Sequence, residues 1–254
     1  ESLVASQKSV QLDPQDAEAH NNLGNTLKEL GRLKEAEASY RKSIVLKPDY
    51  AEAHNNLGAT LQELGTTPQE LGRLKEAEAS YRQAITLKPD YTEAYNNLGI
   101  ILQELGRLNE AEANLRQAIT LKPNLAEAHN NLGNTLKDLG RLNEAEASYG
   151  KSIVLKPDYA EAHNNLGNTL KELVRLNEAE ASYRKSIVLK PDYAEAHNNL
   201  GVMLQGLGRL EEAELSYRKA ITLKPDYTEA HRNLTSIKKF DTQDEQYSKM
   251  QELY

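Results

Sequence analysis

The chain has 254 residues, of which 39% are hydrophobic, and its formal net charge is −7 at pH 7. This acidity argues against a nucleic-acid backbone as a partner. The lack of cysteine excludes disulfides and thiolate metal sites, and no apolar run approaches the roughly 20 residues of a membrane span.

Known catalytic motifs are missing from the sequence. It contains no glycine-rich phosphate loop followed by lysine, no G-x-S-x-G and no H-E-x-x-H. We therefore expect a cytoplasmic protein without catalytic residues, cofactor or bound metal.

Residues 1–16 read as an incomplete module. The stretch Ser6–Pro14, SQKSVQLDP, aligns with YRKSIVLKP at 40–48, so it predicts a second helix that lacks its first. We expect the natural protein to continue at its N-terminus. An open end with uncovered apolar surface also favours end-to-end stacking between molecules.

A repeat follows, and its period is marked by prolines at spacings of 34, 41, 34, 34, 34 and 34 residues: Pro14, Pro48, Pro89, Pro123, Pro157, Pro191 and Pro225. A fixed period of this length is typical of a solenoid. Six full units fit, at 17–50, 51–91, 92–125, 126–159, 160–193 and 194–227.

The first unit predicts two helices. Its first half places apolar positions on one helical face, at His20, Leu23, Gly24 and Leu27. Gly31 can then stop the helix in the left-handed conformation. A second helical pattern runs over 33–47 and ends before Pro48, because a residue before proline avoids the α region. Neither helix is stable alone, so we expect an all-α, extended superhelix of stacked antiparallel helix pairs.

The repeat resembles the tetratricopeptide repeat (TPR) family, whose period is also 34 residues. The resemblance rests on positions 4, 7, 8, 11, 20, 24, 27 and 32 of the unit, which are His20, Leu23, Gly24, Leu27, Ala36, Tyr40, Ser43 and Pro48. The family usually has a large aromatic residue at the fourth position, where this chain has His in five units and Tyr95 in the other. The resemblance implies a right-handed superhelix that holds protein or peptide partners in a concave groove.

The unit 51–91 carries seven extra residues around Thr66, Thr67 and Pro68. Pro68 forbids a continuous helix, and Thr67-Pro68-Gln69-Glu70 reads as a capping box. We expect the second helix of this unit to begin near Pro68, with Gly72 inside or interrupting it. The alternative is a longer surface loop.

Three residues depart from the repeat locally. Val174 replaces the stopping glycine, and a β-branched residue is expected to avoid the left-handed conformation, which would cost it about 1–2 kcal/mol. Gly150 replaces arginine within a helix, at a cost of roughly 1 kcal/mol relative to alanine. Gly206 does likewise near the end of a first helix.

Residues 228–254 predict a degenerate seventh unit with C-terminal capping helices. Thr235 and Lys238 stand where glycine and leucine belong, Ile237 and Phe240 carry the apolar face, and 241–254 reads as another amphipathic helix. This tail is similar to the junction in bacterial proteins that join TPR arrays to a sulfotransferase-like domain.

The polar face of each first helix is the candidate binding site. Positions 2, 6, 9 and 13 fall within about 60° of one another at 100° per residue. Asparagine recurs at the sixth position, at Asn22, Asn56, Asn97, Asn131, Asn165, Asn199 and Asn233. This resembles the asparagine ladder of O-linked N-acetylglucosamine transferases, in which the amides hold the backbone of an extended peptide.

The same face carries ninth-position amides at Asn25, Asn134 and Asn168 and second-position glutamates at Glu18, Glu52, Glu93, Glu127, Glu161, Glu195 and Glu229. The carboxylates favour partners that bear Lys or Arg. The alternative is a solvated polar face in which each amide bonds locally or to water. Duplication of one unit would also repeat its asparagines.

Histidine recurs at the fourth position, at His20, His54, His129, His163, His197 and His231. Successive copies are expected about 8–10 Å apart, which is too far to share one metal ion. We therefore interpret them as partly buried packing residues. The same interpretation applies to the tyrosines of the second helices, Tyr40, Tyr81, Tyr149, Tyr183 and Tyr217.

The sequence thus favours a non-catalytic scaffold that binds proteins or peptides. Two alternatives stay open. One is the recognition arm of a larger sulfotransferase or glycosyltransferase, and the other is a self-assembling structural array.

Overall fold

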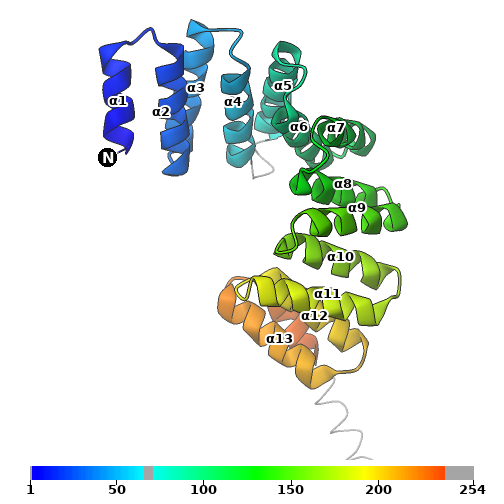
Figure 1. Cartoon of the computed structure of the whole chain (residues 1–254). Helices are drawn as coiled ribbons and strands as arrows, with labels where there is room; N and C mark the ends of the chain where they lie inside the picture. Colours follow the sequence, from blue (N-terminus) through cyan, green and yellow to red (C-terminus); the bar gives the residue numbers. More distant parts are fainter. Residues whose placement is uncertain (1, 66–70, 238–254) are drawn as a thin grey trace, which may run out of the picture. The chain divides into compact units, whose positions relative to one another are not determined.

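The computed structural model describes residues 2–65 and 71–237, and the regular elements in these ranges are α-helices (Figure 1). The chain divides into two compact units, Glu1–Leu139 and Gly140–Tyr254. The expectations for Pro68, for Phe240 and for 241–254 lie outside the described residues.

The first unit stacks helix pairs in chain order. Its helices are α1 (Ser2–Leu12), α2 (Ala17–Glu29), α3 (Leu33–Leu46), α4 (Ala51–Leu64), α5 (Leu71–Leu87), α6 (Thr92–Glu104), α7 (Leu108–Leu121) and α8 (Ala126–Asp138). From α1 to α8, each helix contacts the next one along the chain. The first helices of successive repeats also touch, as α2 with α4, α4 with α6 and α6 with α8.

The second unit repeats this pattern with α9 (Leu142–Leu155), α10 (Ala160–Glu172), α11 (Leu176–Leu189), α12 (Ala194–Gly206) and α13 (Leu210–Leu223). Residues 228–237 are also helical. The predicted all-α stack of antiparallel helix pairs is confirmed (Figure 1). No helix in the described parts of the chain is long and apolar enough to cross a membrane.

The core forms where a second-helix tyrosine packs on a first-helix glycine. Tyr40 is fully buried, and a Cβ atom added to Gly24 would lie 2.5 Å from its Cε1. Only glycine allows this approach, which brings α2 and α3 together. The tyrosine hydroxyl then crosses the pair and donates to Asn25 Oδ1 at 2.8 Å. The predicted packing role of these tyrosines is confirmed.

The fourth-position histidines lie on the packing side of the first helices, as predicted. His54 is half-buried, and its Nε2 donates to the carbonyl of Pro48 at 3.0 Å. A carbonyl can only accept, so Nε2 carries the proton. The other fourth-position histidines make the same bond to the preceding proline, although His231 is exposed. The described residues contain no group of three or more His, Asp or Glu arranged to hold a metal ion.

The helix ends follow the expected chemistry. Gly31 has φ 70°, and the following Arg32 N–H donates to the carbonyl of Leu27 at 2.9 Å. Lys47, which precedes Pro48, leaves the helix with φ −138° and ψ 88°. In the repeat that carries the insert, 51–91, α5 begins at Leu71 and Gly72 lies inside it.

Val174 contradicts the expectation that it would avoid the left-handed region. Its φ is 60°, and it is the one non-glycine residue with positive φ in the described chain. The turn keeps the hydrogen bonds of the glycine version, since Arg175 N–H donates to Leu170 O at 2.9 Å. The bonds and packing of α10 and α11 therefore impose this conformation on a valine whose side chain is 76% exposed.

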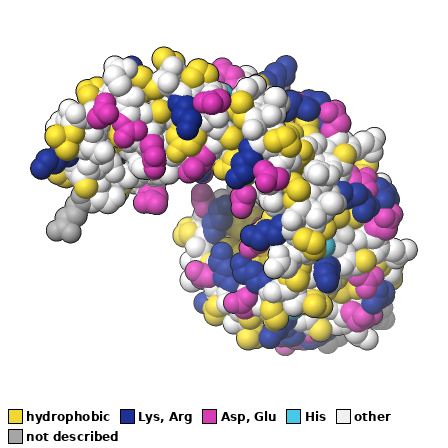
Figure 2. Space-filling model, turned by 45° about the horizontal axis from the view of Figure 1, so that its top comes forward, with side chains coloured by type: hydrophobic (Ala, Val, Ile, Leu, Met, Phe, Trp, Pro, Cys, Tyr) yellow, Lys and Arg dark blue, Asp and Glu magenta, His cyan; other side chains and the backbone are white. Residues whose placement is uncertain are grey.

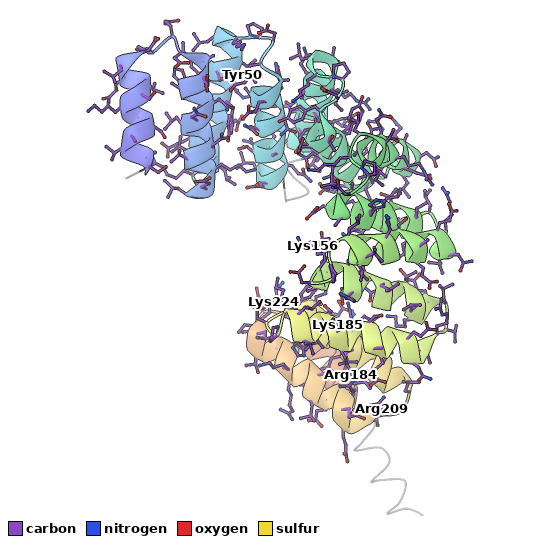
Figure 3. The ribbon with its side chains drawn as sticks, viewed as in Figure 1. Tyr50, Lys156, Arg184, Lys185, Arg209 and Lys224 are labelled. Atoms are coloured by element: carbon purple, nitrogen blue, oxygen red, sulfur yellow. The ribbon has the colours of Figure 1, made fainter. Side chains whose placement is uncertain are left out.

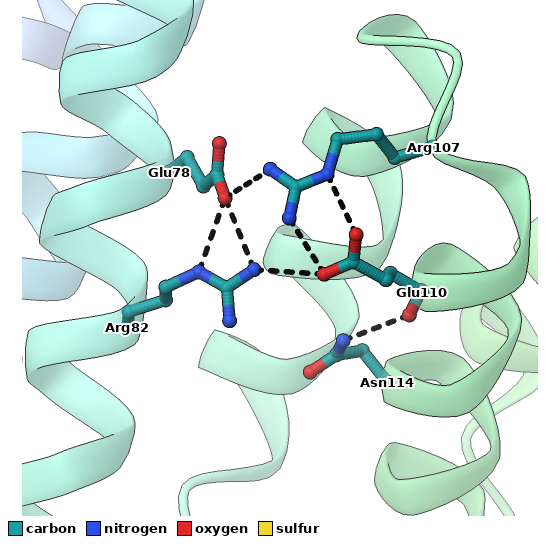
Figure 4. A network of polar contacts seen from close by, with 5 residues as sticks. All are labelled: Glu78, Arg82, Arg107, Glu110 and Asn114. Carbon is teal, nitrogen blue, oxygen red and sulfur yellow. Dashed lines mark hydrogen bonds and ion pairs between the residues drawn. The ribbon is translucent and has the colours of Figure 1, made fainter.

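Ion pairs join the second helices of neighbouring repeats (Figure 4). Arg107 pairs with Glu110 of its own helix at 2.6 Å and with Glu78 of the preceding second helix at 2.5 Å, while Arg82 reaches Glu110 at 3.2 Å. These contacts raise the pKa of Arg107 and lower that of Glu110. Acidic and basic side chains are accordingly interspersed over the visible surface (Figure 2).

Candidate functional site

The candidate site lies on the first helices. We call it the amide face and define it by the second, fifth, sixth and ninth positions of these helices, together with the last residue of each preceding unit. In the second unit it comprises Tyr159, Glu161, Asn164, Asn165, Asn168, Tyr193, Glu195, Asn198, Asn199, Tyr227, Glu229 and Asn233. The second-position glutamates occupy the first turn of each helix, where the helix dipole favours negative charge.

The sixth-position amides, which the sequence singled out, connect one repeat to the next. Asn56 Nδ2 donates to Asn21 Oδ1 and to Asn25 Oδ1 of the preceding repeat, both at 3.1 Å. Asn199 Nδ2 likewise reaches Asn164 Oδ1 at 3.1 Å. The same bond recurs at 3.0–3.3 Å for Asn97, Asn131 and Asn233. One donor of each of these amides therefore stabilises the stack.

Their remaining polar atoms still line the face. A primary amide has two N–H donors and one carbonyl. The carbonyl of Asn199 makes no hydrogen bond within the described chain, and the side chain is half-buried. Asn22 lies at the start of the array and is exposed, whereas Asn165 is half-buried.

The ninth-position candidates are tied to the core. Asn25 Oδ1 accepts from both Tyr40 and Asn56, and Asn168 Oδ1 accepts from Tyr183 at 2.8 Å. Asn134 is half-buried at the equivalent place. Of the second-position candidates, Glu127 is half-buried and Glu161 is exposed.

The fifth-position asparagines were missed by the sequence reasoning. They accept the inter-repeat bonds just described, and Asn21, Asn164 and Asn198 are fully buried. The side-chain amides of Asn21 and Asn198 face the hydroxyls of Tyr50 and Tyr227, and each amide opposes the rise that burial causes in the tyrosine's pKa. The signal was visible as an Asn-Asn pair in every unit, starting with Asn21-Asn22.

A tyrosine at the end of most units also belongs to the face. Tyr50, Tyr91, Tyr159, Tyr193 and Tyr227 are half-buried, while Leu125 takes this place before α8. A lysine three residues earlier lies over each ring, with Nζ 4.8–5.3 Å from the centroid. Figure 3 shows two of these lysines, Lys156 and Lys224, at the same edge of the second unit.

Glutamates and tyrosines alternate along the face. Burial raises the pKa of Tyr193, and Glu195, Glu161 and the neighbouring tyrosines raise it further. Burial together with Glu52 and Glu93 raises the pKa of Tyr91 to about 12. Tyr91 and Tyr193 thus each feel the negative charge of glutamates from two successive repeats.

A hollow of 680 Å³ opens on this face where α4 meets α6. Its polar lining comes from Gln62, Glu63, Asn97 and Glu104, and Gln62 Nε2 donates to Glu104 Oε1 at 2.8 Å. Ala59 borders the hollow at the ninth position, where three other repeats carry asparagine. Two carboxylates in a recess of this size suit a basic side chain.

Solved structures share this architecture. The hetero-tetramer Cut9–Hcn1 of the APC/C aligns with a TM-score of 0.80 at 17% identity, over 92% of this chain and 45% of that chain. PilF of Pseudomonas aeruginosa aligns with a TM-score of 0.71 at 20% identity, over 88% of this chain and 98% of that chain. This chain thus spans less than half the length of the Cut9–Hcn1 chain that it matches.

YrrB, described as a TPR protein with an unusual peptide-binding site, aligns with a TM-score of 0.57 at 26% identity, over 76% of this chain and 95% of that chain. No curated protein matches the sequence. Family models described as TPR repeat match residues 24–65, 70–106, 101–140, 133–174 and 175–208. Models described as tetratricopeptide repeat match 194–227 and 5–38. The chain therefore belongs to the tetratricopeptide repeat family.

Proposed function

We propose that the chain is a non-catalytic scaffold whose amide face binds extended, basic segments of other proteins. The observation that carries this proposal is the set of one glutamate, one tyrosine and two asparagines that recurs in most repeats, on the same side of each first helix. The match to YrrB, whose description names a peptide-binding site, supports it.

The spacing of the repeats sets the register of the ligand. Neighbouring first helices touch, which places their axes about 8–10 Å apart. An extended chain rises about 3.3 Å per residue, so roughly three ligand residues correspond to one repeat. A basic residue at every third position would therefore meet one Glu–Tyr set after another.

The chemistry of the face fits such a segment. Amide groups can pair with peptide N–H and C=O groups without regard to side-chain identity. The carboxylates attract Lys and Arg and increase the association rate, which makes binding depend on salt. The tyrosine rings add apolar surface, and a bound cation can compete with the lysine that now lies over each ring.

A direct test uses fluorescence anisotropy with an extended peptide that carries lysine at every third position. The triple variant Glu18→Gln, Glu52→Gln, Glu93→Gln removes three successive carboxylates from the amide face of the first unit. We expect it to weaken binding about tenfold, or ~1.4 kcal/mol. A peptide with glutamate in place of lysine is expected not to bind.

The matched control is the triple variant Glu35→Gln, Glu144→Gln, Glu211→Gln, which changes the net charge equally on exposed positions of the second helices. It should alter affinity by less than about twofold. Equal losses in the two triple variants, or no binding of the lysine peptide to the unchanged protein, would refute the proposal.

End-to-end self-association is a second candidate function, favoured by the surface of α1. None of its residues is buried, and Val4 and Leu12 are 68% and 78% exposed. Exposed apolar side chains on one helix suit a contact with a different surface of a second molecule. Light scattering should show mass that grows with concentration, and Val4→Lys with Leu12→Lys should abolish the growth. A monomer at all concentrations would remove this candidate.

A further inference from the structure

A second surface, away from the amide face, has the form of a binding site. A hollow of 410 Å³ lies between α11 and α13, and its floor is formed by α12. We call it the outer groove and define it by Ile187, Val188, His197, Leu200, Leu215 and Lys219. His197 and Leu200 are at the fourth and seventh positions of α12, opposite the amides Asn198 and Asn199.

The first unit has a counterpart, which shows that the repeat itself creates this hollow. Its volume is 430 Å³, it lies between α3 and α5, and it is lined at the same repeat positions by Ile44, Val45, His54, Leu57, Ala79 and Gln83. Two residues distinguish the outer groove. Leu215 stands where the counterpart has Ala79, and Lys219 stands where it has Gln83.

Leu215 is a departure within an otherwise repetitive sequence. Alanine occupies the same position in each of the other five units, at Ala38, Ala79, Ala113, Ala147 and Ala181. Leu215 is 68% exposed, and Val188 on the facing helix is 72% exposed. Two large aliphatic side chains therefore flank the hollow and face water, which favours a partner that would cover them.

The charges around the outer groove are unevenly compensated. Arg184 and Arg209 are paired with Glu180 and Glu212. Lys219, by contrast, lines the groove and forms no ion pair with any described residue. His197 donates to Pro191 O, and burial and Lys219 lower its pKa, which favours the neutral ring. The rim thus offers uncompensated positive charge beside an apolar recess.

We propose that the outer groove binds an acidic amphipathic helix of a partner protein. Two parallel ridges, α11 and α13, can accept a third helix that places aliphatic side chains between Val188 and Leu215. Its carboxylates would then lie near Lys219. Recognition of this kind uses anchors at i, i+3, i+4 and i+7 of the bound helix. A lipid surface fits less well, because a recessed floor requires a ligand that enters it.

The chain supplies its own matched variants for a test. Leu215→Ala with Lys219→Gln gives the outer groove the residues of its counterpart, and both replacements occur naturally at these positions of the repeat. The probe is a labelled peptide helix with leucine at i, i+3, i+4 and i+7 and glutamate on its other side. We expect the double variant to bind it about tenfold more weakly than the unchanged protein.

The reciprocal variant, Ala79→Leu with Gln83→Lys, should create a second site and raise the stoichiometry measured by calorimetry from one peptide to two. The triple variant of the amide face should bind this peptide normally, which separates the proposal from the function proposed above. Unchanged affinity in the double variant would overturn the proposal. Equal binding of a lysine-bearing peptide, or binding of anionic vesicles but not of the peptide, would also overturn it.

Discussion

The ring of Tyr217 lies so close to Gly201 that a Cβ atom added to the glycine would be 2.6 Å from Tyr217 Cε1. The tyrosine is fully buried, so its ring cannot move aside without disturbing α12 and α13. The same glycine–tyrosine contact closes the helix pairs at Gly24, Gly58 and Gly167.

Replacing this glycine should destabilise the protein. Gly201→Ala inserts a methyl group into a filled space, and overpacking of this kind costs about 1–3 kcal/mol. Urea unfolding followed by circular dichroism would measure the loss. Gly150→Ala is the control, because an added Cβ meets nothing within 4 Å there, and alanine is the better helix former by about 1 kcal/mol. Equal stability of the Gly201→Ala variant and the unchanged protein would contradict the packing described here.

Val174→Gly should stabilise the second unit. A β-branched residue at φ 60° carries strain of about 1–2 kcal/mol, part of which is offset because glycine is more flexible when unfolded. We expect a net gain of about 1 kcal/mol. The reverse change, Gly208→Val at φ 74°, should destabilise by a similar amount. If both variants shifted unfolding in the same direction, the left-handed turn could not be the cause.

Gly150→Arg should restore an ion-pair link that one repeat lacks. At the equivalent position Arg184 pairs with Glu180 of its own helix and with Glu212 of the next repeat. Removing a glycine from the helix should raise the free energy of unfolding by about 1 kcal/mol. The added surface ion pairs should raise it by up to about 1 kcal/mol more. Comparison with Gly150→Ala separates the two effects. Only the part due to arginine should shrink in high salt.

Stability should fall below about pH 6.5 because of the histidines. Burial lowers the pKa of His163 and of His197 below the ordinary value, so the folded protein binds fewer protons than the unfolded chain. The neutral rings contribute fully to the free energy of unfolding above the pKa that histidine has in the unfolded chain. This contribution is lost as the pH falls through the lower pKa of the folded state. Urea unfolding at a series of pH values measures the slope. His163→Gln with His197→Gln should flatten it, and an unchanged slope would contradict this assignment.

A further loss is expected in more acidic solution from the ion pairs. The Arg209 guanidinium lowers the pKa of Glu180, and Arg107 lowers that of Glu110. Carboxylates with depressed pKa values stabilise the fold above the ordinary value near 4.5 and lose this effect as the pH drops through the folded value. Thermal unfolding between neutral and acidic pH should reveal it. Glu180→Gln should reduce the acid-sensitive part and leave the part near pH 6.5.

The fold could be predicted because the period of 34 residues specifies it. Local chemistry dictates the left-handed turn at Gly31 and the helix end at Lys47 before proline. It likewise dictates the packing role of Tyr40. Val174 could not be predicted in the same way, since its conformation is imposed by the stacked helices around it rather than by its own preference.

The site was harder to predict, because it depends on contacts between repeats. A helical wheel places Asn56 on the polar face, but it cannot show that its Nδ2 reaches Asn21 in the repeat before. For the same reason the wheel does not reveal that Glu161 and Glu195, from two repeats, both raise the pKa of Tyr193. Asn21 is buried and the adjacent Asn22 is exposed, although both are asparagines. The difference in burial comes from the positions of the neighbouring helices, which the sequence of α2 alone does not give.

The asparagine–asparagine bonds described between repeats run in one direction, from a later asparagine back to an earlier one. A module such as 51–91 consequently brings a donor for its predecessor, Asn56, and an acceptor for its successor, Asn55. A gene duplication that inserts or deletes a whole module leaves this polarity intact, so arrays of different length can arise in evolution without any compensating substitution at the new junction.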